Sequence, residues 1–219
     1  NNSGHWGVEG PSSDHAITQL RNRQQRNLLC SLLLAPGVPM LLMGDEVRRS
    51  QGGNNNTWCQ NNPMGWMHWC PDPDDQAQHT FVRRLLKLRN HLSALLNPEL
   101  AHPDRGPGLP AEPGERWRQW HGVEINKPDW AAWSHTLAWS LHESPGSPLV
   151  WCGMNAYGKA IHFDLPVCPS GWLRVIDTGL PAGEDLPERP QPWRPTSAPL
   201  ESRSLMLLVA SPLLEGVEL

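Results

Sequence analysis

The sequence lacks a long apolar run and a strong positive charge. Its longest apolar stretch is interrupted by Pro36 and Gly37, whereas a membrane-spanning helix needs roughly 20 apolar residues. The 18 Lys and Arg residues are scattered and are outnumbered by 22 Asp and Glu, which gives a formal net charge of -4. A protein without a basic face has little with which to neutralise phosphate groups. We therefore expect a globular protein whose partners include no membrane and no nucleic acid.

Cysteine is sparse and irregularly spaced. The five Cys residues are odd in number and form no CxxC pair, which argues against both a disulfide framework and a zinc site. No other set of metal ligands stands out, so we expect no metal and no cofactor. Reduced thiols in a cytoplasm are the simplest interpretation. The chain begins Asn-Asn-Ser, with no initiator Met and no apolar leader, from which we expect an internal start.

Tyrosine and phenylalanine are almost absent, with one Tyr and two Phe, while there are 12 Trp. Tryptophan in such numbers either fills the core of a β-rich domain or offers flat platforms to sugar rings. We expect core packing for most of these residues.

The N-terminal third predicts a helix that begins after Asp14, whose side chain can cap it. Apolar residues recur at helical spacing from Ile17 to Leu33, with Gln24 as the one exception, and the helix ends at Pro36. The face expected to meet water carries Arg21, Arg23, Gln25 and Arg26.

A strand and a second helix follow. Val38–Met43 is an apolar run without polar alternation, which is typical of a strand buried on both faces. Between Phe81 and Leu95, apolar residues recur at steps of four and three, as in an amphipathic helix. The residues expected to face water on this helix are Arg83, Arg84, Lys87 and Arg89.

This order of elements predicts an α/β plus all-β protein. Residues 1–100 fit the last αβα part of a TIM (β/α)8 barrel, and the parallel neighbours that such a strand needs must come from upstream barrel sequence. Residues 101–116 are rich in Pro and Gly and are expected to be a linker. Residues 117–219 contain short apolar or alternating segments between Pro, Gly and Asp clusters, which predict an antiparallel β-sandwich domain.

Several stretches carry a family resemblance. They are GVEGPSSD (7–14), RQQRNLLCSLLLAPGVPMLLMGDE (23–46), QGGNNNTWCQNN (51–62), the Trp66/Trp69 pair, DWAAWSHTLAWSL (129–141) and WLRVIDTGLPAGEDLP (172–187). In this order they resemble the C-terminal part of the isoamylase-type glycogen debranching enzymes of glycoside hydrolase family 13. The resemblance implies a parent enzyme that hydrolyses α-1,6 branch linkages in glycogen or limit dextrin with retention, so the expected partner is a branched α-glucan.

The resemblance also implies that this chain carries no catalytic residue. Retention needs a carboxylate nucleophile and a carboxylic acid about 5–5.5 Å apart. The family's three catalytic carboxylates lie in motifs upstream of the segment that matches Asn1, so the chain alone is expected to be inactive. Asp45 and Glu46 cannot replace them, because adjacent residues on an extended backbone point to opposite faces. We expect one of this pair to fix the end of the predicted strand by hydrogen bonds.

The polar loop, Gly44–Asn62, follows the predicted strand and would line the rim of the glucan cleft, where strand ends hold the active sites of TIM barrels. The candidate substrate-binding residues are Asn54, Asn55, Asn56, Trp58, Gln60 and Asn61. Asparagine amides suit sugar hydroxyls, yet they also hold turns. Trp58 can stack on a glucose face or wedge the loop against the barrel.

The neighbours of these candidates have structural interpretations. We expect Trp66 and Trp69 to pack beneath the loop, Cys59 to be a small packed residue, and His5 and His68 to make loop hydrogen bonds. Compared with the family, Gly4, His5, Trp58, Asn61 and His68 are departures, and two of these replace carboxylates. A non-catalytic glucan-binding or structural module from a divergent paralogue is therefore the alternative interpretation.

Overall fold

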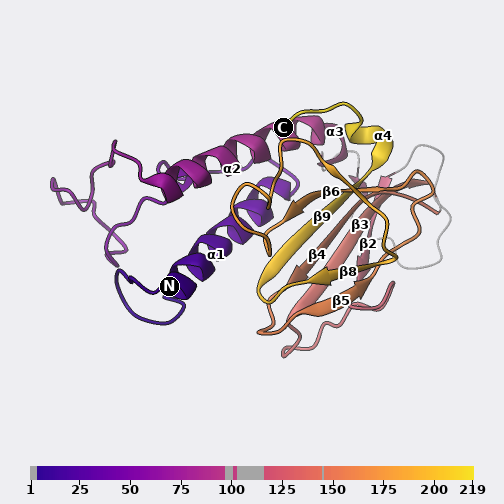
Figure 1. Ribbon diagram of the computed structural model, residues 1–219, viewed down its shortest axis with the longest axis horizontal. Coiled ribbons are helices and arrows are strands. Elements are labelled where there is room, and N and C mark those ends of the chain that lie inside the picture. Colours follow the sequence, from indigo (N-terminus) through magenta and orange to yellow (C-terminus); the bar gives the residue numbers. More distant parts are fainter. Residues whose placement is uncertain (1–3, 97–100, 103–115, 145) are drawn as a thin grey trace.

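The computed structural model of the protein describes residues 4–96, 101–102, 116–144 and 146–219 (Figure 1). A seven-stranded sheet occupies its centre. Two long helices, α1 (His15–Leu34) and α2 (Pro73–His91), cover one face of this sheet, and a two-stranded sheet covers the other. The molecule is therefore mostly antiparallel sheet, with few helices.

The large sheet has the order β1-β2-β3-β4-β9-β6-β7 among the described residues. Its strands are β1 (Ala101–His102), β2 (Arg116–His121), β3 (Thr136–Ser144), β4 (Ser147–Asn155), β9 (Ser204–Ala210), β6 (Trp172–Asp177) and β7 (Gln191–Trp193). The small sheet pairs β5 (Ile161–Asp164) with β8 (Ser197–Leu200). Short helices complete the fold: η1 (Asp45–Val47), α3 (Ser93–Leu96) and α4 (Ser211–Leu214). All strand pairs are antiparallel except β1 with β2.

Local sequence sets where both long helices begin. As predicted, Asp14 caps α1: its side chain accepts hydrogen bonds from the backbone N–H groups of Ala16 (2.8 Å) and Ile17 (3.3 Å). At the start of α2, Asp72 and Asp75 each accept a hydrogen bond from the other's backbone N–H, and Pro73 occupies the first turn. Both predicted helices are confirmed.

The strand predicted over Val38–Met43 is wrong for this chain. No strand forms there in the described structure, and the side chains of Val38 and Met40 are 93% and 87% exposed. A strand is stable only where neighbours complete its hydrogen bonds. No described strand pairs with this segment, and only Leu41 of its apolar side chains packs against the core.

Strand β9 is buried on both faces, whereas the segment 38–43 is not. Leu205, Leu207 and Val209 pack toward the helices, in a core shared with Leu33 of α1 and Leu85 of α2. On the opposite face, Met206 and Leu208 pack with Trp151, Phe163 and Leu200 under the small sheet. All seven residues of β9 are buried as a result.

The predicted antiparallel sheet is thus present, but its two faces are covered differently from a sandwich of two broad sheets. Strands β5 and β8 are the only partners of the large sheet on one face among the described residues, and helices take the other face. The predicted linker lies mostly outside the described residues, which contain only 101–102 and Arg116 of it.

Helix α1 meets the sheet domain partly through polar side chains. Gln24 and Asn27 both donate to the carbonyl oxygen of Arg203, at 3.0 and 2.9 Å, which explains why Gln24 interrupts the apolar pattern. Arg26 is 6% exposed and forms an ion pair with Asp185 at 3.1 Å. The prediction that Arg26 faces water is wrong, because Asp185 in the loop after β6 and the ring of Phe81 in α2 lie against it.

The second helix also uses arginines that were predicted to face water. Arg84 donates to the carbonyl oxygen of Leu186 at 2.9 Å. Arg89 donates to the carbonyl oxygens of Leu33, Ala35 and Gly37. Because the last carbonyls of a helix have no partner within it, Arg89 of α2 in effect caps the end of α1.

Candidate functional site

The polar loop lies within the excursion between α1 and α2, which reaches away from the sheet (Figure 1). It begins with a tight turn at Gly44, which has φ 101°. The N–H of Gly44 donates to Glu46 Oε2 at 2.8 Å, so this carboxylate is engaged in its own turn. Burial, helped by the neighbouring Glu46, raises the pKa of Asp45.

The asparagines of the loop hold consecutive turns. Asn54 Oδ1 accepts from the N–H of Asn56 at 2.9 Å, and Asn56 Oδ1 accepts from the N–H of Trp58 at 3.1 Å. Each is an amide-to-backbone bond two residues along the chain, which fixes the backbone of a turn. Asn55 lies between them with an exposed side chain.

The remaining candidates lie on the same exposed stretch. Gln60 Oε1 accepts from Asn62 Nδ2 at 3.1 Å, and Asn61 Oδ1 accepts from the indole N–H of Trp66 at 2.9 Å. Trp58 is 88% exposed. The loop therefore brings all six predicted binding residues into one short, internally hydrogen-bonded segment.

Two expectations about the surroundings of the loop are wrong. Trp66 and Trp69, predicted to pack beneath it, are 55% and 81% exposed, and Cys59, predicted to be packed, is exposed. A side chain packs only where another element supplies a surface, and the described elements supply none here. His5 and His68 are exposed as well; the carbonyl of His5, not its ring, accepts from Arg21 at 2.9 Å.

Sequence reasoning missed a polar cluster beside the small sheet. Ser140 Oγ lies 2.7 Å from Nε2 of both His121 and His142. His121 Nδ1 accepts from the N–H of Asn126 at 3.0 Å, so the proton of neutral His121 is on Nε2 and is donated to Ser140. The Ser140 hydroxyl then donates to His142. Ser140 and His142 are two residues apart on one predicted strand, and this spacing could have indicated that they share a face. That His121 joins them follows only from the pairing of β2 with β3.

Burial lowers the pKa of His142 to about 4, and burial together with the proximity of His142 lowers the pKa of His121 to about 4 as well. The ring of His142 stacks on Trp117 at 5.3 Å. This cluster contains no carboxylate, and both rings are neutral near pH 7. The cluster is a buried set of side-chain hydrogen bonds that links β2 to β3.

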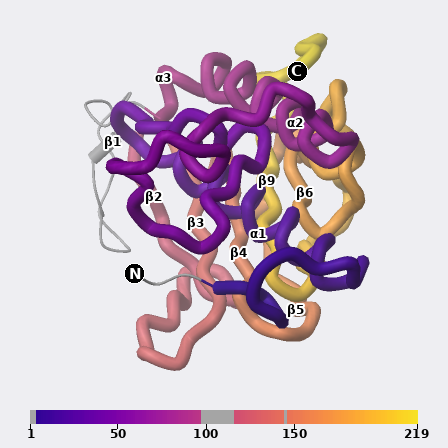
Figure 2. The backbone as a smooth tube through the Cα atoms, turned by 90° about the vertical axis from the view of Figure 1, so that its left-hand side faces the viewer, coloured from indigo at the N-terminus to yellow at the C-terminus, as the bar shows by residue number. Residues whose placement is uncertain are grey.

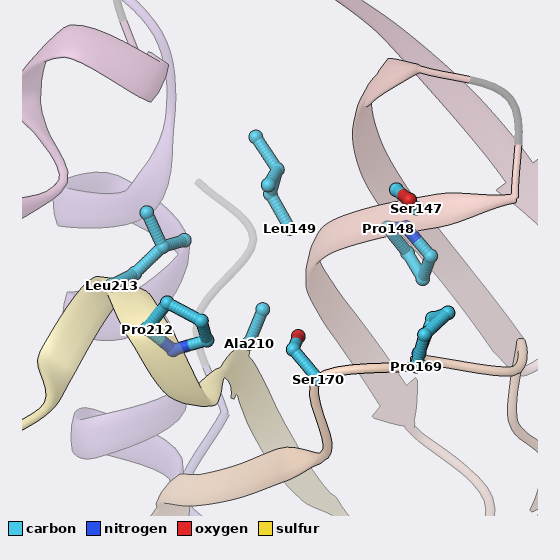
Figure 3. Close-up of a pocket in the computed structure, with 8 residues that line it drawn as sticks. All are labelled: Ser147, Pro148, Leu149, Pro169, Ser170, Ala210, Pro212 and Leu213. Carbon is cyan, nitrogen blue, oxygen red and sulfur yellow. The ribbon is translucent and has the colours of Figure 1, made fainter.

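Two cavities of the described structure show no arrangement of catalytic groups. One, of about 170 Å³, opens at the end of the sheet between Pro148, Leu149, Pro212 and Leu213 (Figure 3). A second, also about 170 Å³, lies between α1 and the sheet and is lined by Cys30 and Cys152, whose thiols have pKa values raised by burial, that of Cys152 to about 12. A thiol with so high a pKa is a poor nucleophile.

The described residues contain neither a candidate metal site nor a candidate membrane span. Within the described ranges, no three His, Cys, Asp or Glu side chains gather as a metal site would require. Neither α1 nor any other described helix combines the length and the apolarity needed to cross a bilayer.

The arrangement of helices and sheet defines a known class of fold. It matches part of the pullulanase type I from Bacillus subtilis, solved in complex with maltose, with a TM-score of 0.56 and 16% sequence identity. The match covers 91% of this chain and 24% of the pullulanase.

Sequence comparison adds the family. Residues 119–193 match the family model of the C-terminal domain of isoamylases 1–3. The chain is 34% identical over 198 residues to the chloroplastic isoamylase 1 of Arabidopsis thaliana (86% of this chain, 23% of that protein). It is 36% identical over 137 residues to the glycogen debranching enzyme of Pectobacterium atrosepticum (63% and 20%). The chain is thereby identified with the C-terminal part of isoamylase-type debranching enzymes of glycoside hydrolase family 13, and the resemblance seen in the sequence is confirmed. It spans less than a quarter of the length of these relatives.

Proposed function

We propose that the chain is the C-terminal portion of a glycogen debranching enzyme, which hydrolyses α-1,6 linkages in glycogen or limit dextrin by a retaining mechanism in the cytoplasm. The similarity to debranching enzymes and isoamylases across most of the chain carries this proposal. The nucleophile and the acid belong to upstream sequence, and the chain alone is inactive. Asp45 and Glu46 do not substitute for them, since Glu46 bonds the amide of Gly44 in its own turn.

We further propose that Val38–Met43 is the last strand of a TIM barrel completed by that upstream sequence. The supporting observation is its exposure: an apolar segment between two packed helices leaves Val38, Met40, Leu42 and Met43 between 62% and 93% exposed. Such exposure is costly unless another part of the protein covers it. The polar loop that follows would then sit at the carboxyl end of a barrel strand, on the rim of the glucan cleft.

In this proposal, the six candidate residues of the polar loop contact glucan: Asn54, Asn55, Asn56, Trp58, Gln60 and Asn61. The turns held by Asn54 and Asn56 fix the backbone that carries the exposed Trp58 ring. A fixed backbone lowers the entropic cost of stacking on a glucose face. Gln60 and Asn61 supply amides for hydroxyl groups.

The test is the extended protein, with its upstream sequence restored, assayed for release of linear oligosaccharides from limit dextrin. We expect hydrolysis, and we expect Trp58→Ala to raise KM about tenfold, because a lost stacking contact is worth roughly 1.4 kcal/mol. The matched control is Trp69→Ala, which removes an equally exposed indole outside the candidate set. An extended protein that cuts no branch points would refute the enzymatic proposal.

The alternative is a non-catalytic glucan-binding module. It is favoured by one observation: half of the 12 tryptophans, all of which lie in the described ranges, are exposed, namely Trp6, Trp58, Trp66, Trp69, Trp130 and Trp133. The expectation that most tryptophans fill the core is therefore wrong. This alternative predicts glycogen binding by an extended protein that lacks hydrolysis.

A further inference from the structure

A second aromatic surface lies on the loop between β2 and β3, residues 122–135. Trp130 and Trp133 on this loop are 65% and 79% exposed. Figure 2 shows the loop projecting from the lower end of the sheet, below the purple segment that joins α1 and α2. Two exposed indoles on one short loop are costly in water and mark a binding surface more often than a packing defect.

The loop is held firmly by its own hydrogen bonds. The N–H of Ala131 donates to Asp129 Oδ1 at 3.0 Å, and the N–H of Ser134 donates to the carbonyl of Ala131 at 2.9 Å. At Gly122 the chain passes so close to itself that a Cβ would lie 2.2 Å from the carbonyl oxygen of Lys127. The backbone of the segment that carries both tryptophans is therefore fixed before any ligand arrives.

Two further bonds tie the loop to the sheets. The N–H of Asp164, at the end of β5, donates to the carbonyl of Val123 at 2.8 Å. The N–H of Ala156, just after β4, donates to the carbonyl of His135, also at 2.8 Å. Because both ends of the loop are anchored, little conformational entropy remains to be lost on binding.

Trp130 packs on one side against Trp120, which in turn lies beside Arg118 and Trp139. Its indole meets the ring of Trp120 edge to face, with centroids 5.6 Å apart and planes at 76°. The guanidinium of Arg118 lies 5.5 Å from the ring of Trp120 and 5.5 Å from that of buried Trp139. Trp130 is thus anchored on one side and exposed on the other, as a platform requires.

The charges around the platform favour an uncharged ligand. Lys127 is paired with Glu124 at 2.6 Å, and Asp129 is the next acidic residue along the loop. A surface with one neutralised cation and an extra carboxylate does not attract phosphate groups. A pyranose ring offers an apolar face to an indole and hydroxyl groups to the flanking polar residues, and it suits this combination.

We propose that Trp130 and Trp133 form a surface site for an α-glucan chain, separate from the polar loop. The choice of an α-glucan among sugars rests on the proposed function. The assignment of the two tryptophans as an aromatic platform does not depend on that function. The site would hold the polysaccharide, and it is a binding site without a chemical step.

The test is native electrophoresis of the full chain through gels that contain glycogen, hydroxyethyl cellulose or no polysaccharide. We expect retardation in glycogen alone, an apparent Kd raised about tenfold by Trp133→Ala, and recovery with Trp133→Phe. The matched control is Trp69→Ala, which removes an 81% exposed indole that belongs to neither proposed glucan-binding surface and should leave the retardation unchanged. Trp133→Ala should keep the wild-type melting temperature, because its indole is exposed.

Two results would overturn the proposal: an unretarded wild-type chain, or a Trp133→Ala variant that binds like wild type. Retardation that is equal in cellulose and glycogen gels would overturn the α-glucan assignment. Failure of the extended protein to hydrolyse limit dextrin would refute the proposed activity and leave these binding results standing, so the two failures are distinguishable.

Discussion

At the scale of single residues, the pair of histidines joined by Ser140 sets a pH dependence of stability. Both pKa values are lowered to about 4 in the folded protein, against about 6.5 in an unfolded chain. Below pH 6.5 the unfolded chain therefore binds protons that the folded protein does not. The folded state loses stability as the pH falls from 6.5 toward 4.

We expect the free energy of unfolding in urea to fall by on the order of 2 kcal/mol between pH 7 and pH 5, after allowance for partial solvent screening. A double His121→Asn, His142→Gln variant should lose most of this dependence. The single variant His79→Gln, on the exposed side of α2, is the control and should keep it. A wild-type protein whose stability is flat over this range would contradict the depressed pKa values.

At the scale of elements, α1 is fixed to the sheet domain by charge as well as by apolar packing. Arg26 and Asp185 form a buried ion pair, and the carboxylate also accepts from the N–H groups of Gly183 and Leu186, both at 3.0 Å. Burial raises the pKa of Asp185, and Arg26 is the foremost of the groups that oppose this rise. Removal of the guanidinium would leave a buried carboxylate without its counter-charge.

We expect Arg26→Met to lower the free energy of unfolding by about 3 kcal/mol, since an unpaired buried charge is costly. Chemical denaturation measures this loss, with Arg83→Met on the exposed face of α2 as the control. Addition of Asp185→Asn should restore part of the stability. An Arg26→Met variant as stable as the wild type would show that the ion pair contributes little to the docking of α1.

Elements were predicted well where their causes are local. The cap at Asp14 and the apolar period of α1 and α2 depend on residues within a turn or two, and the cap and both helices were confirmed, although Leu28 of the apolar series in α1 is 70% exposed. The sequence left Gln24 unexplained and placed Arg26 in water because their partners, Arg203 and Asp185, are more than 150 residues away in the sequence. No local pattern identifies a carbonyl or a carboxylate supplied by another element.

At the scale of the whole molecule, the exposed segment Val38–Met43 should govern self-association of the isolated chain. We expect Met40→Lys to reduce association in light scattering without lowering the melting temperature, because Met40 is 87% exposed. Val167→Lys, at an isolated position that is 81% exposed, is the control and should change neither property.

The same substitution should act differently in the extended protein. If the segment is a barrel strand there, Met40→Lys buries a charge and lowers stability by about 3 kcal/mol. Equal tolerance of Met40→Lys in both proteins would argue against the proposed barrel strand. The binding residues of the polar loop remain predictions, and the structure adds to them the turns that hold Asn54, Asn56 and Trp58 in place.

The sequence by itself determined the helices, the turn-bounded apolar segments of the sheet and the relationship to debranching enzymes, since each is written in residues close together along the chain. Tertiary structure alone decided which apolar segments are covered. SLMLLVA in β9 and VPMLLM at 38–43 are similar runs, yet the first lies between helices and a small sheet while the second is open to water. The same holds for Trp139 and Trp133, one buried and one exposed. Exposure depends on what folds against a side chain from elsewhere in the sequence, and only the assembled fold specifies that.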